Sequence, residues 1–177
     1  MGIRQENGLT ALELIVTMAV IAILLAAGVP AIENYALNLR MRTAMDMLVS
    51  DLAQARSHAI SHNVQTVICP AAENNDCSAE AAWNDGWILF TDLNADRHKQ
   101  ESEPLLKHGG TVELLNINSS DSRRSLRFYP NGTAPGSNTS ILFCDGRGTS
   151  HANTVKLSNS GRIRTQAYAG EPTEICP

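Results

Sequence analysis

The pattern of hydrophobic and polar positions predicts one long helix at the start of the chain, with two different halves. Sixteen consecutive residues from Leu14 to Val29 carry no charge. As a helix they would span roughly 24 Å, close to the hydrocarbon thickness of a bilayer. After Pro30, apolar side chains recur at intervals of three and four residues and so share one stripe: Leu37, Met41, Met45, Leu48, Leu52, Ala55 and Ala59. We expect a single helix from about Thr10 to His62, bent or interrupted at Pro30 because proline has no N–H to donate.

Beyond Asn63 the pattern changes to short β-branched and aromatic runs. Turn signals such as Asn84-Asp-Gly and Pro130-Asn-Gly separate these runs. The runs predict seven strands: Val64–Cys69, Trp87–Thr91, Val112–Ile117, Ser125–Tyr129, Ile141–Cys144, Thr154–Leu157 and Arg162–Ala167. One helix followed by strands predicts an α+β fold, with antiparallel sheet packed on the carboxyl half of the helix.

One carboxylate interrupts the leading edge of the apolar segment. Glu13 would be costly in lipid, and such a residue is usually functional. It is the fifth residue after Gly8, counting Leu9 as the first, and Pro30 is then the twenty-second.

This layout resembles the amino terminus of type IV pilins and pseudopilins. The resemblance implies a leader peptide (residues 1–8), which prepilin peptidase removes by cutting between Gly8 and Leu9, and N-methylation of Leu9. It also implies that Glu13 pairs with the amino terminus of a neighbouring subunit during assembly, which offsets part of the cost of burying a charge. Leu9 stands where Phe is usual, and Ala11 where Leu is usual.

A secretory signal peptide or a plain membrane anchor is the alternative for this segment. The cleavage site of a secretory signal peptide would follow the apolar core, and Leu24-Leu-Ala-Ala-Gly has suitable small residues. That alternative gives Glu13 no role.

Five later motifs narrow the family: Gln54-Ala-Arg-Ser-His-Ala, Val67-Ile-Cys-Pro, Trp87-Ile-Leu-Phe-Thr-Asp, Phe143-Cys-Asp-Gly-Arg-Gly and Gly161-Arg-Ile-Arg. Together they resemble the FimT/FimU-type minor pilins and the related H-type (GspH-like) minor pseudopilins of type II secretion. The implied fold is the type IV pilin fold, with a filament-core or transmembrane half-helix (residues 9–30), an amphipathic half-helix (31–62) and a β-rich globular domain (63–177).

Charge is unevenly distributed along the chain, whose formal net charge is −4. Residues 46–121 hold twelve acids and four bases, whereas residues 122–170 hold seven bases and one acid. This asymmetry indicates two different surfaces.

Four cysteines in a chain held outside the cytoplasm indicate two disulfides, for which three pairings exist. We favour Cys69–Cys77, which closes a short loop after a strand, and Cys144–Cys176, which ties the last residues to a strand. A zinc site drawn from His58, His62, Cys69 and Cys77 is the alternative, but it lacks a Cys-x-x-Cys pair.

The basic carboxyl region is the first candidate site. Arg162 and Arg164 alternate along a predicted strand, which places both side chains on one face, with Lys156 on the partner strand and Arg147 in a turn. Paired guanidiniums hold phosphate oxygens well. In the FimT branch a Gly-Arg-x-Arg motif at this place is associated with DNA binding, so the resemblance implies DNA as a ligand of these residues. The alternatives are a solvated strand face and a contact with an acidic subunit.

Two further chemistries have incomplete motifs. Asp92-Leu-Asn-Ala-Asp96, with Glu103 at the twelfth position, has the spacing of a calcium loop, but Arg97 stands where such a loop needs glycine. Ser57 and His58 belong to no catalytic motif. We therefore expect no enzyme, no cofactor and no bound metal.

The sequence thus predicts a minor pilin of the inner membrane, single-pass with a periplasmic globular domain, that enters the extracellular type IV pilus at or near its tip. Its partners would be other minor and major pilins, and it would help to prime pilus assembly. The alternatives are a DNA-binding minor pilin for natural transformation and a minor pseudopilin of type II secretion.

Overall fold

The computed structural model describes residues 10–72, 76–80, 82–171 and 176. The chain divides into two compact units, residues 1–40 and 41–177. The long helix α1 (Ala11–His62) begins in the first unit and ends in the second. The predicted leader and the predicted cut between Gly8 and Leu9 lie outside the described residues.

The part of α1 in the first unit is apolar and exposed. An 18-residue window of this helix has a mean hydropathy of 2.6 with none of it buried, so by length and composition the helix is long and apolar enough to cross a membrane. The helix continues through Pro30, and Asn34 Nδ2 donates to the Pro30 carbonyl at 3.0 Å.

Thr10 and Glu13 form a capping box at the start of α1. Glu13 N donates to Thr10 Oγ1 at 3.2 Å, and Thr10 N donates to Glu13 Oε2 at 3.0 Å. The two residues therefore satisfy backbone donors that a helix start otherwise leaves open.

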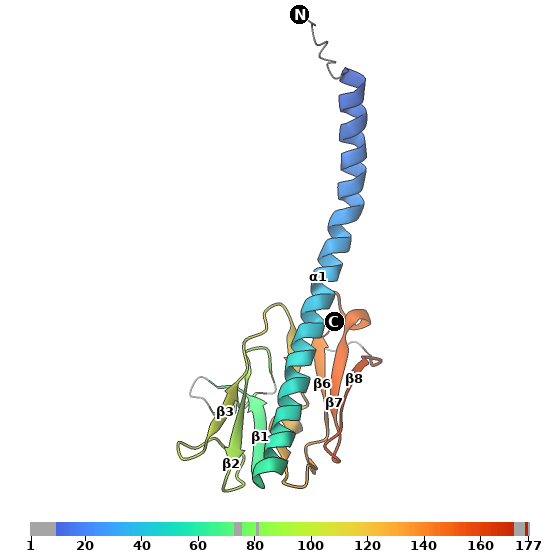
Figure 1. Ribbon diagram of the computed structural model, residues 1–177. Coiled ribbons are helices and arrows are strands. Elements are labelled where there is room, and N and C mark those ends of the chain that lie inside the picture. Colours follow the sequence, from blue (N-terminus) through green and yellow to red (C-terminus); the bar gives the residue numbers. More distant parts are fainter. Residues whose placement is uncertain (1–9, 73–75, 81, 172–175, 177) are drawn as a thin grey trace, which may run out of the picture. The chain divides into compact units, whose positions relative to one another are not determined.

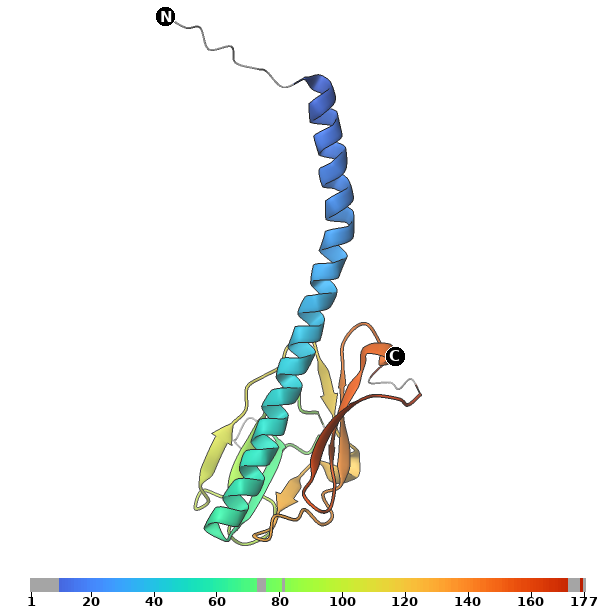
Figure 2. The same ribbon diagram turned by 45° about the vertical axis from the view of Figure 1, so that its right-hand side comes forward.

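In the second unit, the remaining part of α1 packs on two antiparallel four-stranded sheets. The first sheet has the order β3-β2-β1-β5 and the second β4-β6-β7-β8. Figure 1 shows β1 to β3 on one side of this helical segment and β6 to β8 on the other, and in Figure 2 the segment passes in front of the green strands of the first sheet. The strands are β1 (Gln65–Pro70), β2 (Trp87–Asp92), β3 (Leu105–His108), β4 (Asn116–Asn118), β5 (Leu126–Phe128), β6 (Thr139–Cys144), β7 (Asn153–Leu157) and β8 (Ile163–Ala167). Two short 3₁₀ helices, η1 (Asp121–Arg123) and η2 (Thr149–His151), lie in the connections.

One core joins the helix to both sheets. Leu48 and Leu52 of α1 are fully buried with Ile68 and Phe128 of the first sheet and Phe143 of the second. From Met41 onward, all members of the predicted apolar stripe are buried. The α+β fold with a long amino-terminal helix packed on antiparallel sheet is therefore confirmed.

Two details of the strand prediction were wrong. Only the end of the predicted strand Val112–Ile117 pairs, as β4, because Val112 N bonds to Asn84 O and Leu114 takes a positive φ of 62°. Strand β3 was not predicted. It is an edge strand in which Leu106 is partly buried and the other residues are exposed, so its sequence has no apolar alternation that would indicate a strand.

The cysteines pair as Cys69–Cys77 and Cys144–Cys176, the two pairings that the sequence favoured. Because Cys69 and Cys77 are bonded to each other, they are not available for the alternative zinc site. Cys176 is buried with Cys144 and Ala152 on the face of the second sheet that points away from α1.

Candidate functional site

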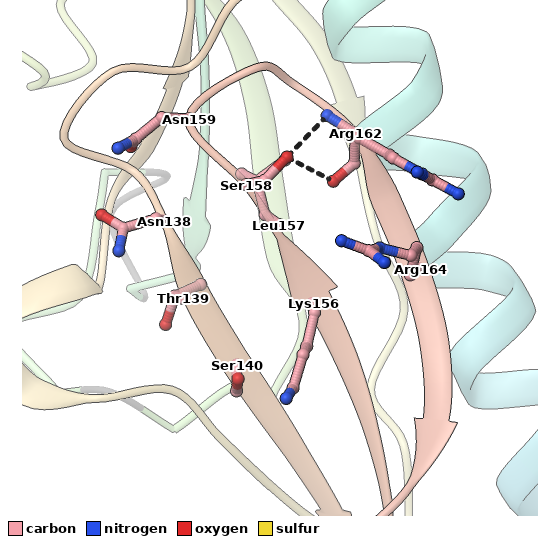
Figure 3. A pocket seen from close by; sticks show the side chains of 9 residues that line it. All are labelled: Asn138, Thr139, Ser140, Lys156, Leu157, Ser158, Asn159, Arg162 and Arg164. Atoms are coloured by element: carbon pink, nitrogen blue, oxygen red, sulfur yellow. Dashed lines mark hydrogen bonds between the residues drawn. The ribbon is translucent and has the colours of Figure 1, made fainter.

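A basic groove of about 440 Å³ lies on the second sheet. Its charged lining residues are Lys156, Arg162 and Arg164, and the rest of its lining is polar apart from Leu157. Figure 3 shows these side chains around the ends of β6, β7 and β8. Its lining contains no aspartate or glutamate. The ion pairs among the described residues are Lys107–Asp51 and Arg147–Asp145, so none of the three cations of the groove takes part in one.

Strand register brings two of the cations together. Lys156 of β7 is directly opposite Arg164 of β8, and Ser140 of β6 is directly opposite Lys156. Like charges that face each other across a strand pair destabilise the sheet. The arrangement therefore costs stability in the free protein, and an anion that bound between the two cations would recover it.

A tight turn positions Arg162. Gly161 N donates to Ser158 O at 2.8 Å, and the Arg162 amide donates to Ser158 Oγ at 3.2 Å. Gly161 has a φ of +76°, and a Cβ there would overlap the carbonyl oxygen of Gly132. Arg56 of α1 donates from Nε to that same oxygen at 2.9 Å. The turn is thus held against the helix, and only glycine fits the contact.

Arg162 and Arg164 do not reach the same place. Arg162 lies just before β8, and in Figure 3 its guanidinium extends toward α1, whereas that of Arg164 lies on the β7 side. Arg162 also lines a second groove of about 480 Å³, which it shares with Arg56, Ile60 and Ile163. It therefore connects the basic groove with a partly apolar groove beside the helix.

Arg147, the fourth predicted cation, lies outside the groove. It follows Cys144, the last residue of β6, whereas Ser140 in the groove lies near the first residue of that strand. Its Nη2 is 2.6 Å from Oδ2 of the buried Asp145, and its Nε is 3.1 Å from both carboxylate oxygens. Burial opposes ionisation of Asp145, but the hydrogen bonds from Arg147 outweigh it and lower the pKa of that carboxyl. The charge of Arg147 is therefore used within the fold.

Two carboxylates of the loop with calcium-like spacing accept amides of the loop itself, whereas the buried Oδ1 of Asp92 has no hydrogen-bond partner among the described residues. Glu103 accepts the Leu93 amide at 2.8 Å and the Gln100 amide at 3.1 Å, and Asp96 accepts the His98 amide at 2.8 Å. Arg97 takes a φ of 68°, the conformation that glycine usually supplies in a calcium loop. In the parts of the chain that the structure describes, no group of three His, Cys, Asp or Glu side chains is arranged to hold a metal.

Sequence reasoning missed the cap at the start of α1. Thr10 was not identified as a capping residue, although Thr-x-x-Glu before an apolar run is a capping signature.

The chain resembles one known protein family in sequence. The profile of the family described as "Type II transport protein GspH" matches residues 44–161. The sequence has no significant match among curated proteins.

Two solved structures resemble the chain, both of the type IV minor pilin FimU from Pseudomonas aeruginosa. One has 20% identity and a TM-score of 0.57 and covers 77% of this chain and 99% of its own. The other has 18% identity and a TM-score of 0.60, and the match covers 81% of this chain and 99% of the FimU chain. At this identity the likeness establishes the fold. The descriptions name a transport protein and pilins, in agreement with the expectation of a protein that is not an enzyme. The chain belongs to the GspH family, and it has the type IV pilin fold seen in FimU.

Proposed function

We propose that this protein is a minor pilin that is anchored in the inner membrane and then built into a type IV pilus. The observation that carries the proposal is the apolar segment of α1 between Leu14 and Val29, which no other described part of the chain buries. Exposed apolar surface of this extent is stable only in lipid or against other helices. A filament subunit meets both environments in turn.

The proposal includes processing of the amino terminus. Prepilin peptidase would cut after Gly8 and the new amino group of Leu9 would be methylated, which leaves residues 9–30 as the membrane and filament-core half-helix. The remaining parts would be the amphipathic half-helix (31–62) and the globular domain (63–177), which selects neighbouring pilins and primes assembly near the tip.

Glu13 provides a test of the assembly step, because it also caps its own helix. Glu13→Gln removes the charge and keeps an oxygen that can accept the Thr10 amide. Thr10→Ala removes the hydroxyl that accepts the Glu13 amide and keeps the charge. If the charge recruits the neighbouring amino terminus, Glu13→Gln lowers the amount of this protein in sheared pili, and Thr10→Ala leaves it close to wild type. Equal incorporation of both variants and wild type would contradict the assembly role.

A deletion strain separates the pilus from the secretion branch. Loss of surface pili with normal export of secreted proteins supports the minor pilin. The reverse result supports a minor pseudopilin of type II secretion, the function that the family description names.

A second candidate function is DNA binding by the same protein. It is favoured by the groove that holds Lys156, Arg162 and Arg164 without a carboxylate in its lining. Asn138 and Ser140 lie in the same lining and offer polar groups for a phosphodiester backbone.

The DNA test uses the full chain in detergent micelles and a labelled oligonucleotide. We expect the Arg162→Gln, Arg164→Gln double variant to weaken binding and to flatten its salt dependence by about one unit of log–log slope for each phosphate that it no longer neutralises. Arg124→Gln is the matched control, because Arg124 is exposed and lies outside the groove. Unchanged affinity in the double variant, or an equal weakening in the control, would contradict the proposal.

A further inference from the structure

Strand β8 is an open edge of the second sheet. It pairs with β7 on one side, and among the described residues no strand pairs with its other side. Ile163 is partly buried, and the residues from Arg164 to Ala167 are exposed. An exposed edge strand of this kind can pair with a strand of another chain.

The hydrogen bonds at both ends of β8 show which of its backbone groups are open. Arg162 O accepts the Ser158 amide at 3.0 Å, and the Tyr168 amide donates to Ala152 O at 2.9 Å. Even-numbered residues therefore bond toward β7, and in an antiparallel pair the residues between them point their backbone groups to the other side. These outward N–H and C=O groups, for which the described residues supply no partner, belong to Ile163, Thr165 and Ala167.

A groove of about 480 Å³ lies beside this edge, between α1 and the start of β8. In Figure 3, α1 lies on the side of β8 that is away from β7. The apolar part of the lining includes Val49 and Ile60 of α1 and Ile163 of β8, and Ile60 is 50% exposed. Because side chains alternate between the two faces of a strand, an added strand would place every second side chain near this apolar surface.

Positive charge at the edge selects the partner. The groove lining includes Arg56 and Arg162 and no carboxylate, and Arg164 is exposed on β8 itself. A second copy of β8 at this edge would bring arginines close to one another, and like charges across a strand pair are destabilising. Opposite charges stabilise such a pair, so the edge favours an acidic strand over a copy of itself.

We propose that β8 and the groove beside it bind an extended, acidic peptide segment of another protein by strand addition. The backbone of the segment would pair with the outward groups of β8, its acidic side chains would face Arg162 and Arg164, and the alternate apolar side chains would lie near Ile60 and Ile163. A nucleic acid would contact the arginine side chains but would not extend the sheet. The proposal does not depend on the proposed pilus function.

Two labelled synthetic peptides of about six residues test the proposal on the full chain in non-ionic detergent. One alternates glutamate with valine, and the other alternates lysine with valine. Fluorescence anisotropy measures their binding, and hydrogen exchange followed by NMR reports on single amides. We expect the glutamate peptide to bind, the lysine peptide not to bind, and the glutamate peptide to slow exchange at the amides of Ile163, Thr165 and Ala167.

Matched variants separate the backbone from the side chains. Thr165→Pro removes one outward N–H, at a place where an edge strand tolerates proline, and should weaken binding of the glutamate peptide about tenfold. Thr165→Ala keeps that N–H and should bind as wild type. Arg162→Gln should weaken binding about three- to fivefold, whereas Arg124→Gln, which lies outside the groove, should leave it unchanged. If Thr165→Pro does not fold, Arg162→Gln and the exchange measurement decide.

Four outcomes would overturn the proposal. One is equal binding of the two peptides, or binding of neither. Another is binding of the glutamate peptide with unchanged exchange in β8, which would mean a contact with side chains alone. The third is an equal loss of binding in Thr165→Pro and Thr165→Ala. The last is an oligonucleotide that slows exchange in β8 where the peptide does not, which would assign this edge to DNA.

Discussion

The two parts of α1 share one helical backbone, but among the described residues the buried side chains of this helix all lie in the second unit. Leu24 in the first unit is 65% exposed, whereas Leu48 in the second is 0% exposed. The same residue type in the same helix is thus buried by the chain in one case and left exposed in the other. Among the described residues the apolar window of the first part is left uncovered, which is what the proposed anchor in lipid or in a filament requires.

The carboxylates of the helix show the same contrast. Asp51 is buried, where it accepts the Trp87 indole N–H at 2.8 Å and pairs with Lys107. Glu13 is exposed, and among the described residues its side chain bonds to Thr10. A residue's contribution to stability therefore depends on which part of the helix carries it.

The largest effect is expected from truncating the buried leucine. Leu48→Ala should lower the free energy of unfolding by about 3–4 kcal/mol, because it removes buried methyl groups and leaves a cavity. Denaturant unfolding of the full chain in detergent, followed by the fluorescence of the buried Trp83 and Trp87, measures it. Leu24→Ala is the matched control and should change this free energy by less than about 0.5 kcal/mol. Equal destabilisation by the two substitutions would contradict the difference in burial between the two parts of the helix.

Removing the buried carboxylate should have the next largest effect. Asp51→Ala leaves the Trp87 indole without its acceptor and Lys107 without its partner, at a cost of about 2–3 kcal/mol in the free energy of unfolding. The control is Asp46→Ala, on an exposed position of the same helix. A variant as stable as the control would show that the pair contributes nothing.

The helix could be predicted closely from the sequence, because its spacing of three and four residues is a local signal. The structure begins it at Ala11 rather than Thr10 and ends it at His62, as predicted. The strand pairing could not be predicted, because it joins residues that are far apart. Nothing local indicates that β5 pairs with β1 while β6 pairs with β4 and β7 in a separate sheet.

The candidate site was predicted in part. Lys156, Arg162 and Arg164 do line one groove, because hairpin register follows from a short turn. Arg147 does not, because the sequence does not show that Asp145, two residues earlier, is buried and engages its guanidinium.

The basic residues differ in the same way, because Arg147 pairs with the buried Asp145 whereas Lys156, Arg162 and Arg164 line an open groove. Asp145→Asn should cost about 1–2 kcal/mol in the free energy of unfolding at pH 7, because Arg147 loses its charged acceptor. The folded-state pKa of Asp145 is lowered from 3.8, so its ionisation stabilises the fold above that pH and ceases to do so as the pH falls through the lower folded value. Denaturant unfolding at several pH values should therefore show the gap between variant and wild type closing below about pH 4. A gap that stays constant down to about pH 2 would contradict this role for the ionised carboxylate.

The smallest effect should have the opposite sign. Lys156→Gln removes a like charge opposite Arg164 and should raise the free energy of unfolding by about 0.2–1 kcal/mol, while it weakens any anion binding in the groove. A gain at low salt that shrinks at high salt identifies the repulsion. A loss of stability at both salt concentrations would mean that Lys156 has a partner in the fold.

The amino terminus of the mature protein, isolated from membranes or pili and determined by mass spectrometry, is the most direct test of the proposed pilin anchor. We expect a chain that begins at Leu9 with a methylated amino group and retains the apolar half of α1. A mature chain that begins beyond Gly28, with this segment removed, would contradict the proposal.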